Sequence, residues 1–267
     1  MYSTSSIIIA FTLTLIAGLS TGIGGILATQ VKCTNKKFLS GSLAFSAGVM
    51  VYVSFMEMLP DGFETLNKEY GHKGELFAIL AFIVGILIIG IIDRLIPEET
   101  NFHEIGILDD CQVSDANKSL VRVGLFSALA VTIHNLPEGM ATFMASLSDP
   151  ALGISIALAI ALHNIPEGIA VAVPIFHATN SKKKALKYAF ISGLAEPLGA
   201  LLTFLFLMPF LNDTIIGIVF CIVAGIMIYI SIEELMPAAH KFGHHHITIY
   251  SFMAGMIIMA ISLFLLH

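Results

Sequence analysis

Long apolar stretches separated by short polar ones dominate the chain. Eight of them reach the ~20 residues that a helix needs to cross the hydrocarbon core of a bilayer. Runs this long and this continuously apolar predict helices, not the alternating strands of a membrane barrel. We therefore expect an all-α integral membrane protein, with one transmembrane domain over residues 1–267 and helices at about 6–30, 39–60, 75–95, 120–146, 151–176, 186–210, 214–238 and 247–266.

The composition agrees with this pattern. Of the 267 residues, 57% are hydrophobic and only 12% are charged, whereas soluble domains carry about 25% charged residues. The net charge of −6 gives no reason to expect a nucleic-acid partner. The three cysteines, Cys33, Cys111 and Cys221, form neither a disulfide framework nor a CxxC metal site. No basic residue precedes the first apolar run, so we expect that run to be a retained span and not a signal peptide.

Basic residues predict the orientation. If the N-terminus lies outside, 11 of the 13 Lys and Arg residues fall in inner loops. The positive-inside rule then predicts that both termini lie outside a cell membrane. The run Lys182–Lys184 is expected to have this topogenic role. The longest inner loop, about 96–119, is acidic and is expected to be a solvated linker.

Two segments far apart in the chain resemble each other. Ala47–Pro60 (AGVMVYVSFMEMLP) and Ala224–Pro237 (AGIMIYISIEELMP) share seven of fourteen positions at an offset of 177. Fainter matches link Gly18 to Gly193, and Phe82 and Gly85 to Phe252 and Gly255. Helices one to three thus resemble helices six to eight, and paired helices cross the membrane in opposite directions. This predicts a 3+2+3 inverted repeat, a plan common in secondary transporters.

The two central helices carry a repeated hexapeptide. HNLPEG runs from His134 to Gly139 and HNIPEG from His163 to Gly168, starting 29 residues apart. Each His lies four residues before its Glu, so the two side chains share one helix face. His, Asn and Glu side chains are all ligands for first-row metal ions. The candidate ligands are therefore His134, Asn135, Glu138, His163, Asn164 and Glu167.

A third carboxylate completes the candidate site. Ionisable residues inside spans cost about 2.5–3.5 kcal/mol each on insertion scales, yet Glu196 lies in the middle of the sixth span. Three carboxylates facing one another in a low dielectric repel, and a divalent cation removes that repulsion. Pro137, Pro166 and Pro197 should free nearby carbonyls. In the repeat Thr21 aligns with Glu196, and no metal role is expected for it.

Other polar residues have two interpretations each. Glu57 and Glu234 are expected at helix ends, where they either cap an entrance or contact metal in a vestibule. The last inner loop carries four histidines, which form either a polar turn or a cytosolic release site for metal: His240, His244, His245 and His246. The methionines are expected to serve packing.

The doublet and the frame GLAEPLGA around Glu196 resemble the ZIP family of divalent-metal transporters, in particular its bacterial broad-range subgroup. The resemblance covers all eight spans. It implies uptake of Zn²⁺, and also of Fe²⁺, Mn²⁺ or Co²⁺, into the cytosol, without a prosthetic group. It further implies a binuclear site, with Glu138 and Glu167 bridging one set that includes His134 and His163 and another that includes Asn135, Asn164 and Glu196. Family members often form dimers, so a homodimer is one expectation.

An intramembrane metalloenzyme is the alternative. His and Glu ligands suit a catalytic zinc with an open position. However, HExxH is absent and no separate general base or nucleophile is evident. The absence of thiolates near the doublet favours borderline and hard ions over Cu(I).

Overall fold

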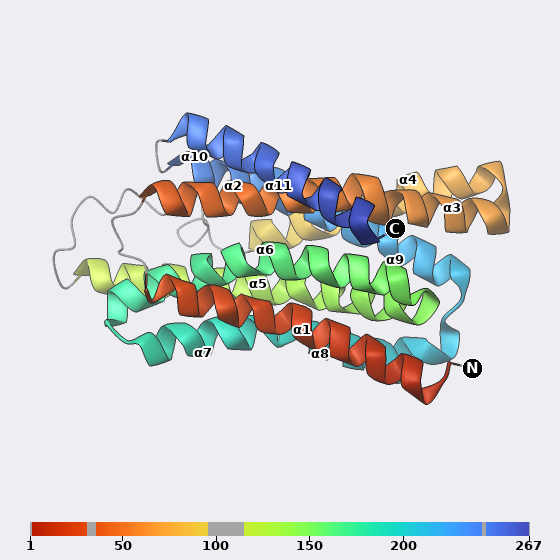
Figure 1. Ribbon diagram of the computed structural model, residues 1–267, viewed down its shortest axis with the longest axis horizontal. Coiled ribbons are helices and arrows are strands. Elements are labelled where there is room, and N and C mark those ends of the chain that lie inside the picture. Colours follow the sequence, from red (N-terminus) through yellow and green to blue (C-terminus); the bar gives the residue numbers. More distant parts are fainter. Residues whose placement is uncertain (1, 31–35, 96–114, 242–243, 267) are drawn as a thin grey trace.

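The chain folds entirely into helices where the structure describes it. The computed structural model describes residues 2–30, 36–95, 115–241 and 244–266, and within these ranges it leaves out a few side chains, that of His134 among them. Figure 1 shows the elongated bundle, with both chain ends at the same end. Its elements are α1 (Thr4–Ala28), α2 (Lys36–Val53), η1 (Ser54–Met58), α3 (Leu59–Tyr70), α4 (His72–Leu95), α5 (Asp115–Ser148), α6 (Pro150–Thr179), α7 (Lys182–Gly193), α8 (Ala195–Leu202), η4 (Thr203–Leu207), η5 (Met208–Phe210), α9 (Asp213–Tyr229), η6 (Ile230–Leu235), α10 (Met236–Lys241) and α11 (His245–Leu266).

Seven helical stretches in the described part of the chain are long and apolar enough to cross a membrane. They are α1, the helix over 37–70, α4, α6, and the stretches 182–210, 213–240 and 245–265. The predicted all-helical membrane class is therefore confirmed. The expected linker at 96–119 lies mostly outside the described residues, and its last five residues are the start of α5.

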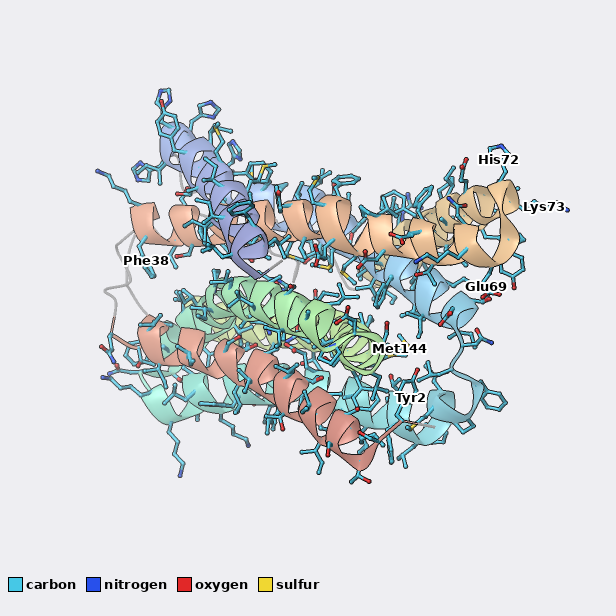
Figure 2. The ribbon with its side chains drawn as sticks, turned by 45° about the vertical axis from the view of Figure 1, so that its right-hand side comes forward. Tyr2, Phe38, Glu69, His72, Lys73 and Met144 are labelled. Atoms are coloured by element: carbon cyan, nitrogen blue, oxygen red, sulfur yellow. The ribbon has the colours of Figure 1, made fainter. Side chains whose placement is uncertain are left out.

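The second predicted span ends too early. We expected it to stop at Pro60, but the helical path continues through η1 into α3 and ends only at Tyr70. Pro60 lies in the first turn of α3, where a missing N–H group costs little. Leu66 is then buried against Ala78 and Cys221, which stabilises the extension. Gly71, with a φ of 57°, makes the turn into α4. Figure 2 shows Glu69, His72 and Lys73 at this projecting tip.

The helices form two layers, as Figure 1 shows. The first layer contains α1, α5, α6, α7 and α8, which contact one another extensively. The second layer contains α2, α3, α4, α9, α10 and α11. Polar caps start several of these helices: Asp149 caps α6, Ser181 caps α7 and Asn212 caps α9.

Glycines bring backbones of the first layer into direct contact. A Cβ atom at Gly24 of α1 would overlap the carbonyl oxygen of Ile165 in α6. One at Gly168 of α6 would overlap the carbonyl oxygen of Thr21 in α1. The same arrangement occurs between α5 and α8, where Gly139 meets the carbonyl of Glu196 and Gly199 meets that of Leu136. Such close approach is available only to glycine, so these contacts hold the helices in one register.

The second layer repeats this device. Gly48 of α2 meets the carbonyl of Phe252 in α11, and Gly255 meets that of Phe45. Between α9 and α4, the corresponding contacts join Gly225 to Phe82 and Gly85 to Ile222. For every described glycine with a neighbour in another helix, the nearest atoms belong to its own layer. The two layers therefore meet through side chains and not through tight backbone contacts.

We predict that Gly24→Ala destabilises the fold more than Gly41→Ala. The added methyl at Gly24 meets backbone, and overpacking of this kind costs about 1–3 kcal/mol. At Gly41 the nearest atom is the Ser251 hydroxyl at 3.1 Å, which belongs to a side chain that can rotate. Thermal unfolding of the purified proteins in one detergent measures the difference, at about 2–4 °C per kcal/mol. Equal losses for the two variants would contradict the prediction.

Candidate metal centre

The repeated hexapeptides lie side by side in the interior of the first layer. α5 and α6 each continue through their proline, and α5 contacts α6 along its length. Asn135, Glu138, His163 and Asn164 are completely buried, and Glu167 is 1% exposed. The expected convergence of the two helices on one polar centre is thus seen for every doublet side chain that the structure describes. The side chain of His134 lies outside that description.

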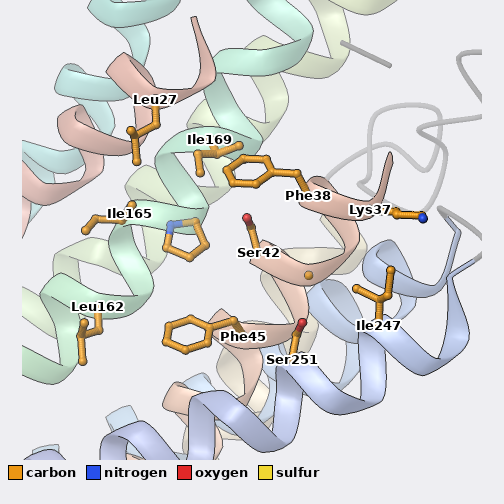
Figure 3. Close-up of a pocket in the computed structure, with 12 residues that line it drawn as sticks. Leu27, Lys37, Phe38, Ser42, Phe45, Leu162, Ile165, Ile169, Ile247 and Ser251 are labelled. Carbon is orange, nitrogen blue, oxygen red and sulfur yellow. The ribbon is translucent and has the colours of Figure 1, made fainter. Parts of the chain in front are cut away.

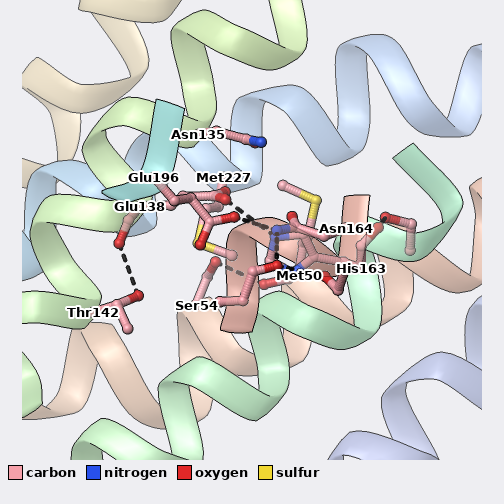
Figure 4. Close-up of polar contacts among 12 residues, drawn as sticks. Met50, Ser54, Asn135, Glu138, Thr142, His163, Asn164, Glu196 and Met227 are labelled. Atoms are coloured by element: carbon pink, nitrogen blue, oxygen red, sulfur yellow. Dashed lines mark hydrogen bonds and ion pairs between the residues drawn. The ribbon is translucent and has the colours of Figure 1, made fainter. Parts of the chain in front are cut away.

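Glu138 and His163 join the two helices directly. Glu138 Oε2 lies 3.2 Å from His163 Nε2, and both side chains are fully buried. The carbonyl oxygen of His163 accepts a hydrogen bond of 3.2 Å from the Ser46 hydroxyl of α2, in the second layer. Thr142 donates to the carbonyl of Glu138 at 2.9 Å. Figure 4 shows these contacts, with Met50 and Met227 next to the acidic side chains.

Asn164 connects α6 to two further helices. Its Nδ2 atom donates to the carbonyl oxygen of Ala17 in α1 at 3.0 Å. The same atom donates to Oε1 of Glu196, the first acidic residue of α8. Glu196 is completely buried and lies close to Glu138 in Figure 4. The structure therefore brings the third predicted carboxylate to the same centre.

Asn135 makes the corresponding bond on the other side. Its Nδ2 atom donates to the carbonyl oxygen of Ser192 at 3.3 Å, near the end of α7. Sequence reasoning did not identify the Ala17 and Ser192 carbonyls, because a backbone acceptor leaves no residue signature. The signal that links them is their spacing: Ser192 follows Ala17 by 175 residues, the same offset that relates Gly193 to Gly18.

Several buried oxygens at this centre make no hydrogen bond with other described residues. They are Asn135 Oδ1, Glu138 Oε1, Asn164 Oδ1, Glu196 Oε2 and, in α1, Thr21 Oγ1. Buried polar atoms in native proteins almost always have a partner. A concentration of such oxygens in one place is the donor set that a hard or borderline cation requires.

The described side chains do not enclose an ion as they stand. Among the described residues, no group of three or more His, Cys, Asp or Glu side chains has a geometry that could hold a metal. The reason lies in the contacts: Glu138 faces His163, and Glu196 faces Asn164. A cation would have to take the place of these hydrogen bonds.

Comparison with known proteins gives the family. The family model described as "ZIP Zinc transporter" matches residues 4–102 and 97–263. The chain is 53% identical to zinc transporter ZupT of Streptococcus mutans, over 96% of this chain and 97% of that one. It is 52% identical to zinc transporter ZupT of Oceanobacillus iheyensis, over 98% and 99% of the two chains. The chain belongs to the ZIP family.

Membership of the ZIP family decides between the two functional classes. The relatives are named as transporters and none of those compared here is named as an enzyme. The intramembrane metalloenzyme therefore has no support. ZIP proteins are membrane proteins, and the seven long apolar helices agree with a multi-pass chain.

The peripheral acidic residues do not lie at helix ends, as we had expected. Glu57 lies within the π-helical segment η1 and Glu234 within the π-helical segment η6. The reason is that both helices continue, into α3 and α10. Ser54 and Ser231, at equivalent places in the two segments, each bond the carbonyl four residues earlier at 2.7 Å. Such π-helical turns often occur at functional sites.

The histidines near the C-terminus gather around the start of α11. The ring centroids of His240 and His245 lie 5.5 Å apart, and those of His245 and His246 lie 5.6 Å apart. His246 also stacks on Tyr250. His240 Nδ1 donates to the carbonyl of Met236 at 2.9 Å, which leaves its other nitrogen for further contacts. His244, His245 and His246 thus share one end of the bundle with His240.

A separate cavity opens between the two layers. It has a volume of about 450 Å³ and lies between α1 and α6 on one side and α2 and α11 on the other. Figure 3 shows its apolar lining of Leu27, Phe38, Phe45 and Ile165. Because carboxylates and histidines are absent from this lining, the cavity is unsuited to hold a cation.

We predict that Glu138→Gln stabilises the protein in a buffer with a strong chelator. Glutamine can still bond His163, but it removes one of three buried negative charges, whose mutual repulsion destabilises the fold. The melting temperature should rise by about 2–4 °C for each kcal/mol of repulsion removed. Glu64→Gln is the control, since Glu64 is exposed and pairs only with Lys68 at the surface. A lower melting temperature for Glu138→Gln than for this control would contradict the prediction.

Proposed function

We propose that this protein is a secondary transporter that takes up Zn²⁺, together with other divalent ions such as Fe²⁺, Mn²⁺ and Co²⁺, into the cytosol. The observation that carries the proposal is the buried centre itself: three carboxylates, two asparagines and a histidine inside a membrane bundle. The names of the relatives, all zinc transporters, support the choice of ion. The chain contains no nucleotide-binding motif that would suggest ATP.

The proposed binding site holds two ions. On the family motif, one position uses His134, Glu138, His163 and Glu167, and the adjacent one uses Asn135, Glu138, Asn164, Glu167 and Glu196. Glu138 and Glu167 would bridge ions about 3.5–4 Å apart, as in other paired sites. Binding exchanges the Glu138–His163 and Asn164–Glu196 hydrogen bonds for metal bonds. The released imidazole and carboxylate then act as ligands.

We propose a 3+2+3 arrangement of eight spans in which α5 and α6 are the central pair. The recurrence of backbone contacts supports it. The pairs Gly48–Phe252 and Gly225–Phe82 are related by the offset of 177 on one side and by 170 on the other. A contact on the repeat axis, between Gly18 and Gly193, joins equivalent residues to each other. Such recurrence is expected when two halves with the same packing face opposite ways.

The moving unit in this proposal is larger than the α5–α6 pair that we first expected. Glycine contacts fix α5 and α6 to α1 and α8, so the first layer should move as one body. The second layer meets it through side chains such as Met50, Val53 and Ile160. A side-chain interface without interlocked backbones can shift more easily. Alternating access would then occur as the first layer moves with its ions against the second.

The peripheral residues serve the route in this proposal. Glu57 and Glu234, in their π-helical segments, contact ions on the way to the centre, and the histidines at positions 240 and 244–246 receive ions on the cytosolic side. Both roles agree with ligand chemistry. The protein would work in the cell membrane, with both termini outside.

We predict that Glu138→Ala and Glu167→Ala each lower uptake of radioactive zinc into sealed proteoliposomes at least about tenfold. Loss of residues that only support metal ligands already costs about 10–100-fold, and both carboxylates are proposed ligands of two ions. Glu64→Ala, which removes an exposed carboxylate, should leave uptake unchanged. Uptake by either site variant equal to that of the unmutated protein would refute the assignment. Flux without any other substrate would also separate transport from hydrolysis.

We predict that single cysteines report opposite sides of the membrane. In a background with Cys33, Cys111 and Cys221 replaced, Lys73→Cys should react with an impermeant maleimide on intact cells. Lys183→Cys should react only after permeabilisation. Both side chains are exposed, so access and not burial decides the labelling. The reverse pattern would refute the orientation that the basic loops predict.

A further inference from the structure

Thr21 is the buried polar residue at the centre for which the proposed ligand set has no role. It lies in α1 and is 0% exposed. Its hydroxyl oxygen makes no hydrogen bond with the described residues. Threonines inside helices normally bond a carbonyl four residues earlier, as Thr14 does with Ala10 at 2.8 Å.

The usual acceptor for Thr21 is already in use. The Ala17 carbonyl accepts from the Ser20 hydroxyl at 2.6 Å and from Asn164 Nδ2 at 3.0 Å. The Thr21 hydroxyl is therefore directed elsewhere. An unpaired buried hydroxyl costs about 1–3 kcal/mol, so its retention at this position calls for a partner outside the protein's own hydrogen bonds.

Three independent contacts make Thr21 the counterpart of Glu196. The carbonyl of Thr21 lies against Gly168, and that of Glu196 lies against Gly139. The spacing is 29 residues between the glycines and 175 between the acceptors. The bonds from Asn164 to Ala17 and from Asn135 to Ser192 repeat these two spacings.

The contacts of Gly24 with Ile165, and of Gly199 with Leu136, repeat the same pair of spacings a third time. Glu196 Oε1 accepts a hydrogen bond from Asn164. The same relation puts Thr21 beside Asn135. Threonine is shorter than glutamate, so its hydroxyl stops short of the asparagine, and both Asn135 Oδ1 and Thr21 Oγ1 remain without a partner among the described residues.

We propose that the Thr21 hydroxyl holds a water molecule that the transported cation keeps in its coordination shell on the Asn135 side. On the Asn164 side, the charged Glu196 occupies the equivalent place. The two halves of the centre therefore differ: one offers a carboxylate and the other a neutral oxygen with room for water. Ions that keep water depend on Thr21 more than ions that shed it. This inference rests on the proposed function, because it assumes that the centre binds the transported ion.

The test compares uptake of Mn²⁺ and Zn²⁺ by proteoliposomes containing unmutated protein, Thr21→Val, Thr21→Ser or Thr14→Val. Mn²⁺ favours carboxylate, carbonyl and water oxygens, whereas Zn²⁺ also accepts nitrogen ligands and fewer waters. Thr21→Val should raise the ratio of the KM for Mn²⁺ to that for Zn²⁺ about threefold to tenfold, the loss of one hydrogen bond. Thr21→Ser restores the hydroxyl and should return the ratio to normal.

Thr14→Val is the matched control. Thr14 lies in the same helix and is equally buried, but its hydroxyl bonds the backbone. It should leave the ratio unchanged. In chelator, Thr21→Val should melt no lower than Thr14→Val, because only the latter loses a hydrogen bond. An unchanged metal ratio in Thr21→Val, an equal change in Thr14→Val, or a lower melting temperature for Thr21→Val would each overturn the inference. Failure of the unmutated protein to take up either metal would instead refute the proposed function.

Discussion

Three buried carboxylates without a basic residue nearby are the constraint on which the rest of this structure depends. Glu138, Glu167 and Glu196 are at most 1% exposed, and the helix turns that carry them contain no Lys or Arg. Burial penalises the ionised form of each, and the like charges repel. Hydrogen bonds from Asn164 and His163 offset part of that cost. A divalent cation offsets the rest, so the energetics of the fold and the affinity for cargo are linked.

Partners for these carboxylates come from four helices, which explains why the first layer is so tightly joined. A hydrogen bond weakens steeply once donor and acceptor move a few tenths of an ångström beyond about 3.2 Å. Glycine contacts fix α1 to α6 and α5 to α8 at backbone distance, so the donors of one helix stay opposite the acceptors of the next. The second layer contacts this unit through larger side chains, where sliding is less costly. Rigidity is thus concentrated around the polar centre, and freedom remains at the boundary of the layer that contains it.

Sequence patterns predicted much of this, for physical reasons that also show where prediction stops. The spans follow from apolar length, and the HNxPEG doublet follows from ligand chemistry at helical spacing. The extension of the second helix to Tyr70 could not be predicted, because α3 has an exposed face with Glu64 and Lys68 and buries only one side. The acceptors at Ala17 and Ser192 are backbone atoms and depend on packing alone. His134 and the loop before α5 remain predictions, since they lie outside the described side chains.

The repeat also explains why an imperfect symmetry is useful at such a centre. A second glutamate at the position of Thr21 would add a fourth carboxylate to a site that already has three, and the added repulsion would raise the cost of the site between ions. It would also hold a doubly charged ion more firmly than release permits, since a transport site must bind on one side and let go on the other. Threonine keeps an oxygen at the repeat position without the charge. The backbone contacts at Gly168 and Gly139 are retained on both sides of the axis, so packing is symmetric while the electrostatics are not.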